Sequence, residues 1–234
     1  MSDPDAYVML VSSLPDPQAL FLAKQPPLSR LRLDQRLRVL TAEDAERLKL
    51  VEEALNWRQL PMAASEQDVI DRGRAALSKV ESRTLWLILR DRLEIRTCLA
   101  ALRRRARDEG PPSDSVWGFG RWVGHIARNW SEPAFRLERV FPWLREADRL
   151  LRQDDPLALE RLVLDLSYEK LKRQAGEHAF DFEAVVIYVL KWSIVDRWAR
   201  YNAEAAARRF EDLTQAALVA GLGERAALAF EGGA

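Results

Sequence analysis

The stretch FDFEAVVIYVLKWSIVDRW, residues 180–198, is the most hydrophobic part of this 234-residue chain. Six apolar residues run without a break from Val185 to Leu190, and two tryptophans follow them. The longest uncharged run is only seven residues, from Ala184 to Leu190. A membrane span needs about 20 predominantly apolar residues. The stretch therefore predicts a buried helix in the middle of a packed core rather than a membrane span.

The composition indicates a globular chain of amphipathic helices. Apolar residues make up 48% of the chain and charged residues 31%, with 36 basic and 36 acidic side chains. Such a charge-dense mixture lets each helix turn one apolar face inward and one polar face outward. The zero formal net charge disfavours a general nucleic-acid binder, which normally carries a basic excess.

Two features predict a cytoplasmic, soluble protein. Cys98 is the one cysteine in the sequence, so no intramolecular disulfide can form, which fits a reducing compartment. The opening residues MSDPDAYVML carry acids where a signal peptide carries basic residues. We therefore expect no export signal.

Capping residues, prolines and glycines predict where the helices begin and end. Thr41 can cap one helix, and Asp155 followed by Pro156 can begin another. The short apolar run 7–17 fits a strand or a helical turn equally well. We expect helices over residues 28–40, 41 to about 57, 66–108 (one long helix or two in tandem), 116–130, 141–153, 156–175, 181–201 and roughly 203–219.

The predicted fold is therefore all-α, a multi-helix bundle of about seven to nine helices. The strongest break is EGPPSDS, residues 109–115, which holds a glycine, two prolines and two serines. It suggests an N-terminal helical half with a short extended leader, residues 1–110, and a C-terminal helical half, residues 111–234. One continuous domain stays open as an alternative.

No motif in the sequence predicts catalysis, a cofactor or a metal. His125 and His178 lie on different predicted segments, and neither shows a cysteine or an acid at an evident metal-ligand spacing. The glycines of GFGRWVG, residues 118–124, follow no predicted strand, so close helix packing is favoured over phosphate binding. We expect no enzyme activity, no cofactor and no small-molecule substrate.

A basic stretch between residues 72 and 107 is the first candidate functional surface. It holds eleven basic and three acidic residues, a net charge of 11 − 3 = +8. Docking to an acidic protein surface is predicted, with phosphates less favoured because Trp86 is the one aromatic residue in the stretch. The candidate docking residues are Arg103, Arg104, Arg105 and Arg107.

Glu183 and the tryptophans are further candidates. Glu183 falls in the first turn of a very apolar helix, where exposed backbone N–H groups favour an acid. If it is buried it needs a basic partner, and Arg197 or an arginine of the 83–107 helix could form the pair. Trp117, Trp122 and Trp130 lie close together in sequence and are expected in the core, with an interface as the alternative.

Two segments resemble the recurring helix of the C (or d) subunit of V-type and A-type rotary ATPases. They are ESRTLWLILRDRLEIRTCLAALRRRARDEG, residues 81–110, and FDFEAVVIYVLKWSIVDRWARYNAEAAARRFEDL, residues 180–213. Overlaying Leu89–Arg96 on Leu190–Arg197 suggests a two-fold internal repeat. The stretches YVMLVSSLPDP and PPLSRLRLD…LTAEDAERLKL resemble an uncharacterised bacterial family encoded among V-type ATP synthase genes.

The resemblance implies a mechanical role. The expectation is a non-catalytic subunit that couples the central stalk to the membrane rotor ring. Its partners would be other rotary ATPase subunits, and it would be peripheral to the inner membrane through that complex. The alternative is a helical scaffold or nucleic-acid adaptor module that uses the basic 72–107 face.

Overall fold

The computed structural model describes residues 5–16, 20–55, 66–112 and 117–201. Within these ranges the protein is helical and contains no strand, so the predicted all-α bundle is confirmed there. The bounded helices are α1 (Val8–Ser13), α2 (Arg30–Leu37), α3 (Ala42–Leu55), α4 (Glu66–Lys79), α5 (Arg83–Ala106), α6 (Val123–Arg128), the short 3₁₀ helix η2 (Pro133–Arg136), α7 (Leu144–Arg152) and α8 (Pro156–Ala175). Residues 182–201 form one more helix, called here the core helix. The predicted helix over 203–219 lies outside the described residues.

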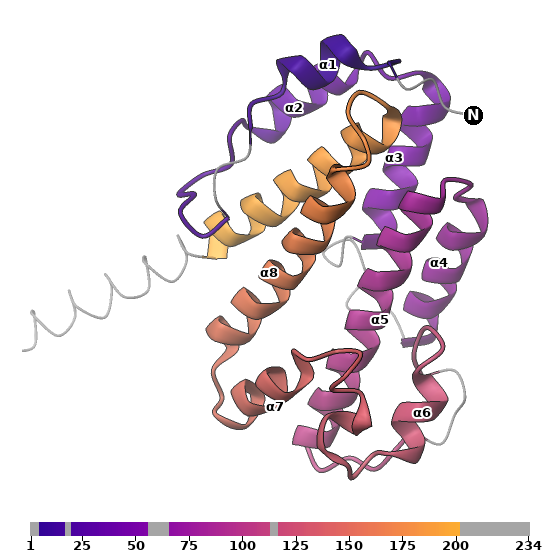
Figure 1. Cartoon of the computed structure of the whole chain (residues 1–234), viewed down its shortest axis with the longest axis vertical. Helices are drawn as coiled ribbons and strands as arrows, with labels where there is room; N and C mark the ends of the chain where they lie inside the picture. The colour runs from indigo at the N-terminus through magenta and orange to yellow at the C-terminus, as the bar shows by residue number, and fades with distance from the viewer. Residues whose placement is uncertain (1–4, 17–19, 56–65, 113–116, 202–234) are drawn as a thin grey trace, which may run out of the picture.

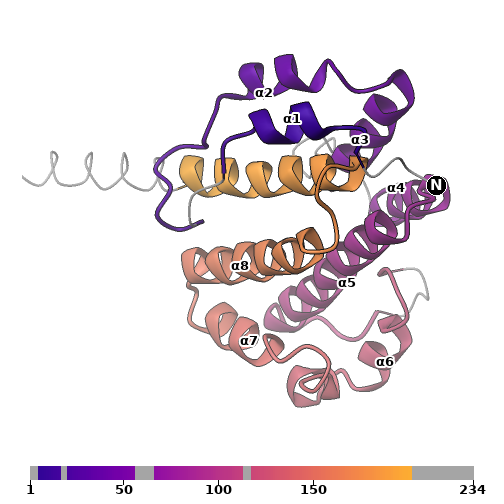
Figure 2. The same cartoon turned by 45° about the horizontal axis from the view of Figure 1, so that its top comes forward.

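Helix α5 is the centre of the molecule. It packs against α3, α4, α6, α7 and α8. In Figure 1, α4 and α6 lie on one side of it and α7 and α8 on the other. The core helix lies beside α8, and α1 and α2 cover its outer face (Figure 2). The region around α6 and α7 lies at the opposite end of α5 from α1.

Side-chain caps mark where several of the helices begin. The Thr41 hydroxyl accepts a hydrogen bond from the Asp44 amide at 3.1 Å, and the Asp155 carboxylate accepts one from the Ala158 amide at 2.9 Å. Both caps confirm the sequence prediction. Residues 66–108 form two helices, because Ser82 caps α5 and residues 80–82 interrupt the run. The apolar leader is helical over Val8–Ser13 rather than extended.

The aromatic stretch 116–130 is less helical than predicted. Only Val123–Arg128 is α-helical, and the residues described before it form turns. Two glycines allow these turns to lie against α5. A Cβ atom at Gly118 would be 2.5 Å from Thr97 Cγ2, and one at Gly120, where φ is +95°, would be 2.8 Å from Glu94 Cγ. Close packing against a neighbouring helix is therefore confirmed.

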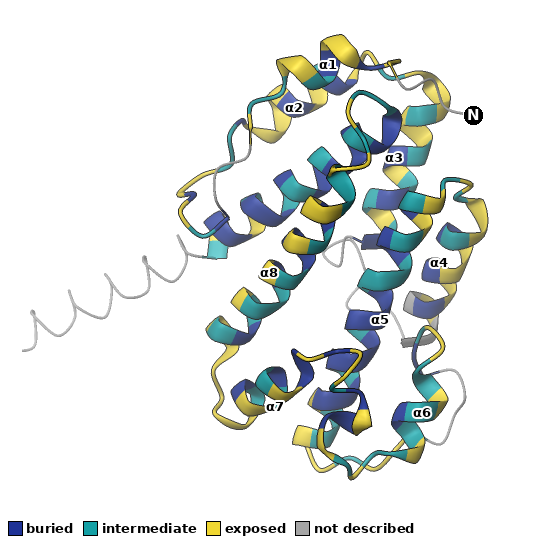
Figure 3. Cartoon of the chain, in the orientation of Figure 1, coloured by how far each residue is buried: buried dark blue, intermediate teal, exposed yellow. Residues whose placement is uncertain are grey.

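Figure 3 shows which residues of each helix are buried. The buried apolar residues form two hydrophobic clusters. The first joins α1–α3, the N-terminal half of α5, α8 and the core helix, and the second joins the C-terminal half of α5 with α6, η2 and α7. In the core helix Val185, Val186 and Val189 are fully buried, so the prediction that residues 180–198 are core is confirmed. Among the described helices none is long and apolar enough to cross a membrane.

The two clusters do not follow the predicted division at residue 110. The core helix, from the C-terminal half, packs in the first cluster with α1–α3 from the N-terminal half. Leu102 of α5 packs in the second cluster with Trp117 and Phe135. Helix α5 therefore contributes to both clusters and connects them.

Candidate functional site

A groove of about 520 Å³ runs between α5, α8 and the core helix. Its apolar lining includes Ile95, Leu99 and Leu159. Its charged lining consists of Arg92, Arg96, Arg103, Arg197 and Glu160. Four cations therefore face one acid among the described residues that line the groove, a net charge of 4 − 1 = +3. The groove is both basic and apolar.

Helix geometry places three of these arginines in one row. Arg92, Arg96 and Arg103 are spaced by four and seven residues on α5, which puts their side chains on one stripe of the helix. Arg103 is exposed, whereas Arg92 and Arg96 are half-buried. Arg197 enters from the core helix and pairs with Glu160 of α8 at 2.5 Å. The one acid on the groove is thus already engaged.

Several positively charged guanidinium groups lie close together in the groove. Burial and, after it, the neighbouring Arg197 guanidinium lower the pKa of Arg92 to about 10. Burial and the neighbouring Arg92 lower the pKa of Arg96 to about 10 in the same way. Arg92 makes no hydrogen bond or ion pair with any residue of the described ranges. An anionic partner would relieve this repulsion.

An adjoining hollow of about 250 Å³ has a different charge pattern. It shares Arg92 and Arg197 with the groove, but its other cations are paired. Arg30 contacts Glu52 at 2.5 Å, and Arg200 forms an ion pair with Asp196. Among the described residues that line the hollow, four cations face two acids, a net charge of 4 − 2 = +2 against +3 for the groove.

The predicted docking residues separate into different roles. Only 16% of the Arg105 side chain is exposed. Its guanidinium donates to the carbonyls of Trp130 and Glu132 at 3.1 and 2.9 Å, and to Asp148 at 3.0 Å. It also lies 4.4 Å from the centre of the Phe135 ring. Through these contacts Arg105 connects the turn before η2 to α5 and α7.

The remaining basic residues of the stretch 72–107 do not form one face. Arg104 and Arg107 both contact Glu109, at 3.1 and 3.0 Å. Arg90 pairs with Asp91 at 2.8 Å. Of the four predicted docking residues, Arg103 is the one that lines the groove. The docking role of these four residues stays a prediction.

The predicted buried pair of Glu183 and Arg197 is wrong. The two residues lie fourteen positions apart on the core helix, which separates them by about 21 Å along its axis. Arg197 pairs with Glu160 instead. Glu183 is buried, 7% exposed, as expected for an acid on this apolar helix. It faces a separate hollow near Arg47 and Lys79.

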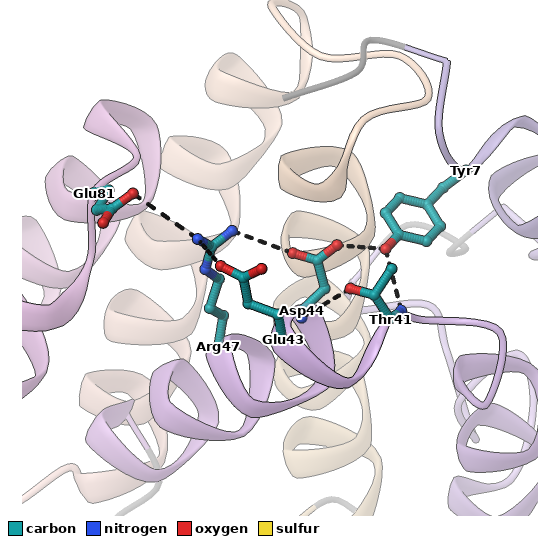
Figure 4. A network of polar contacts seen from close by, with 6 residues as sticks. All are labelled: Tyr7, Thr41, Glu43, Asp44, Arg47 and Glu81. Atoms are coloured by element: carbon teal, nitrogen blue, oxygen red, sulfur yellow. Dashed lines mark hydrogen bonds and ion pairs between the residues drawn. The ribbon is translucent and has the colours of Figure 1, made fainter. Parts of the chain in front are cut away.

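A polar network joins α1 to α3 (Figure 4). The Tyr7 hydroxyl donates a short hydrogen bond to Asp44, whose other oxygen contacts Arg47 at 3.4 Å. Burial and the Asp44 carboxylate raise the pKa of Tyr7. Arg47 also meets Glu43 at 2.5 Å. Each group has a partner, so the network holds α1 in place and offers no reactive side chain.

Of the tryptophans expected in the core, Trp117 is buried, whereas Trp122 and Trp130 are partly buried and pack against the second cluster. Trp117 and Trp143 are each 8% exposed in the second cluster. Trp130 packs against Phe135 with ring centres 5.6 Å apart and donates from its indole nitrogen to the Glu109 carbonyl at 3.1 Å. These contacts favour structure over an interface role.

Comparison with protein-family models, with curated proteins and with solved structures finds no match to this chain. The rotary ATPase resemblance and the two-fold internal repeat therefore stay predictions. Function is inferred instead from the groove and the residues that line it.

Proposed function

We propose that this protein is a non-catalytic helical docking subunit whose arginine-lined groove binds an acidic, amphipathic segment of a partner protein. We further propose that the partner complex is a V/A-type rotary ATPase, in which the chain would couple the central stalk to the membrane rotor ring. The docking function is supported by the structure of the groove. The assignment to a rotary ATPase is supported by the sequence resemblance of residues 81–110 and 180–213.

The observation that carries the proposal is that four arginines and one acid line a groove whose other described lining residues are largely apolar. Arginine favours bidentate contacts with carboxylates and is less strongly hydrated than lysine, so it suits a half-buried interface. Ile95, Leu99 and Leu159 would bury apolar side chains of the same partner segment. A free inorganic anion would use the charge but not this apolar surface.

The form of the molecule suits a mechanical coupling role. Helix α5 spans 24 residues, about 36 Å, and packs along its length against helices of both hydrophobic clusters. A helix supported in this way transmits force with little bending. Both ends of α5 carry separate helical surfaces that two different partners could use.

Nucleic-acid binding is the second candidate, because arginines also contact phosphates. It is less favoured since Tyr201 is the one aromatic residue among the described residues that line the groove. Surfaces that bind single strands normally stack bases on several aromatic rings. Duplex binding would call for a broader basic face than the groove offers.

The test is affinity purification from the native host, with identification of the co-purifying proteins. We expect rotary ATPase stalk or catalytic subunits in stoichiometric amount with the wild-type protein, and a loss of at least about tenfold with Arg103→Glu. Arg83→Glu is the matched control, because Arg83 is an exposed arginine on the same helix outside the groove. Equal recovery with both variants would exclude the groove as the docking site.

The same variants separate the candidate functions. Purification of other acidic proteins, still sensitive to Arg103→Glu, would retain the docking function and reject the rotary ATPase assignment. Binding of a fluorescent single-stranded oligonucleotide that weakens steeply with salt, and is lost in Arg103→Glu, would favour the nucleic-acid adaptor.

A further inference from the structure

A cluster of potential metal ligands lies where α8 connects to the core helix. It consists of His178, Asp181 and Glu183, whose ligand atoms all lie within 4.8 Å of one another. From the sequence we expected no acid at ligand spacing beside His178. The structure corrects this, because the tight turn before the core helix brings acids three and five residues further on close to the imidazole.

Neighbouring residues orient two of these side chains. The His178 Nε2 atom lies 2.9 Å from the Thr84 hydroxyl of α5, and Nδ1 lies 2.5 Å from Asp181 Oδ2. The other oxygen of Asp181 accepts the Ala184 amide at 2.9 Å and caps the core helix. If Nε2–H donates to Thr84, the Nδ1 lone pair points toward the carboxylate. At that distance a proton lies between the two atoms, so a metal ion would replace this proton and move the two ligand atoms slightly apart.

Glu183 supplies the independent evidence for a ligand. Its residue is only 7% exposed, yet its carboxylate has no hydrogen bond or ion pair with any residue in the described part of the chain. Its carboxylate oxygens are not fully enclosed, so a cation can reach them from the neighbouring hollow. The hollow of about 350 Å³ beside it would give a small ion access. Of the cations on that hollow, Arg47 is already bound by Glu43 and Asp44, and Lys79 is the other.

We propose that His178, Asp181 and Glu183 bind a divalent transition-metal ion. One imidazole nitrogen and two carboxylate oxygens are a donor set for Zn²⁺ or Mn²⁺ rather than for Mg²⁺, which prefers oxygen ligands alone. Three protein ligands leave at least one position for water. Thr84 orients the imidazole from behind, so the ion would hold the start of the core helix against the first turn of α5. This site is separate from the groove and does not depend on the proposed docking function.

The test is isothermal titration of the untagged, chelator-treated full chain with ZnCl₂ and MnCl₂. We expect one ion to bind per chain, Glu183→Gln and His178→Gln to weaken binding at least 100-fold, and Thr84→Val to weaken it about tenfold. Glu169→Gln and His125→Gln are the matched controls, since both lie outside the cluster and should bind as the wild type does. Binding that survives both Glu183→Gln and His178→Gln would overturn the proposal.

A second readout protects against loss of folding in a variant. Co²⁺ added to the wild type should give visible absorption bands that reflect an imidazole ligand, and these bands should be absent in His178→Gln. If His178→Gln does not fold, Glu183→Gln serves instead, because it preserves the shape of the side chain. Equal affinity of the wild type for Mg²⁺ and Mn²⁺ would contradict the nitrogen ligand and reject the proposed donor set.

Discussion

Helix α5 carries two groups of arginines that differ in what surrounds them. The groove arginines are Arg92, Arg96 and Arg103, and the tethered arginines are Arg104, Arg105 and Arg107. The tethered arginines meet Glu109, Asp148 and backbone carbonyls. The groove arginines face Glu160, which Arg197 already engages. The tethered arginines of α5 thus stabilise the fold, whereas the groove arginines of the same helix line an open groove.

Counting charged residues in the sequence therefore identifies a basic helix, but it does not show which face of that helix is available to a partner. In the sequence the tethered arginines lie in the densest basic run, so they are the first candidates for a docking surface. In the structure an acid is within reach of each tethered arginine, because the chain turns back at residues 107–109 and α7 packs against α5. Where an arginine finds its partner, rather than how many arginines are adjacent, determines whether it can dock.

The largest effect is expected at Cys98, which is buried on α5 between Arg96 and Arg103. Burial raises the pKa of its thiol to about 12, with a smaller contribution from Glu94. At pH 8 the reactive thiolate is then about 1000-fold scarcer than in an ordinary thiol. We expect labelling by a thiol reagent to be at least that much slower in the native protein than in urea. Comparable rates in the two conditions would show that α5 is not packed as described.

Arg105→Met should be the most destabilising change among the arginines. It leaves Asp148 without one of its partners and two carbonyls without their donor, so we expect the free energy of unfolding to fall by about 3 kcal/mol. Urea denaturation measures this. Arg136→Met is the control, since Arg136 is 65% exposed and pairs only at the surface with Glu132. If both variants lose the same stability, Arg105 is not a tether.

Arg92→Met should act in the opposite direction and stabilise the protein by about 1 kcal/mol while weakening partner binding. The folded-state pKa of Arg92 is lowered to about 10 from 12.5, so the charged form costs stability at every pH below 10. That cost disappears only as the pH rises from 10 toward 12.5. The stability difference from wild type should therefore be constant between about pH 6 and 9. A destabilised variant would mean that the Arg92 guanidinium has a partner.

Arg107→Ala should have the smallest effect. Its side chain is 67% exposed and its pair with Glu109 is solvated, so we expect a change of no more than about 0.5 kcal/mol. Thermal unfolding at low and high salt measures it. A larger loss of stability that disappears at high salt would show that the ion pair of Arg107 stabilises the fold, as that of Arg105 does.

The parts of the fold that depend on neighbouring residues could be predicted from the sequence. The Thr41 and Asp155 caps and the buried run from Val185 to Leu190 follow from local rules. The 3₁₀ turn at η2 could not be predicted, because Ala134 and Phe135 adopt positive φ angles of 46° and 53° that tertiary packing imposes.

The site residues depend on contacts between distant segments. Arg105 meets Asp148 across 43 positions, and Arg197 meets Glu160 across 37. No local pattern reveals either partner. His178, Asp181 and Glu183 lie within six positions of one another, but the orientation of the imidazole depends on Thr84, which is 94 positions away from His178.

The contacts that close α1 and α2 over the core helix have a consequence for synthesis on the ribosome. Tyr188 donates to the Pro15 carbonyl across 173 positions, and the Trp192 indole donates to the Leu28 carbonyl across 164. At a translation rate of about 5–20 residues per second, the N-terminal segment waits roughly 10–30 s for its partner helix to emerge. During that interval the apolar faces of α1–α3 have no core helix to cover them. The nascent chain therefore exposes these apolar faces to solvent until the core helix emerges.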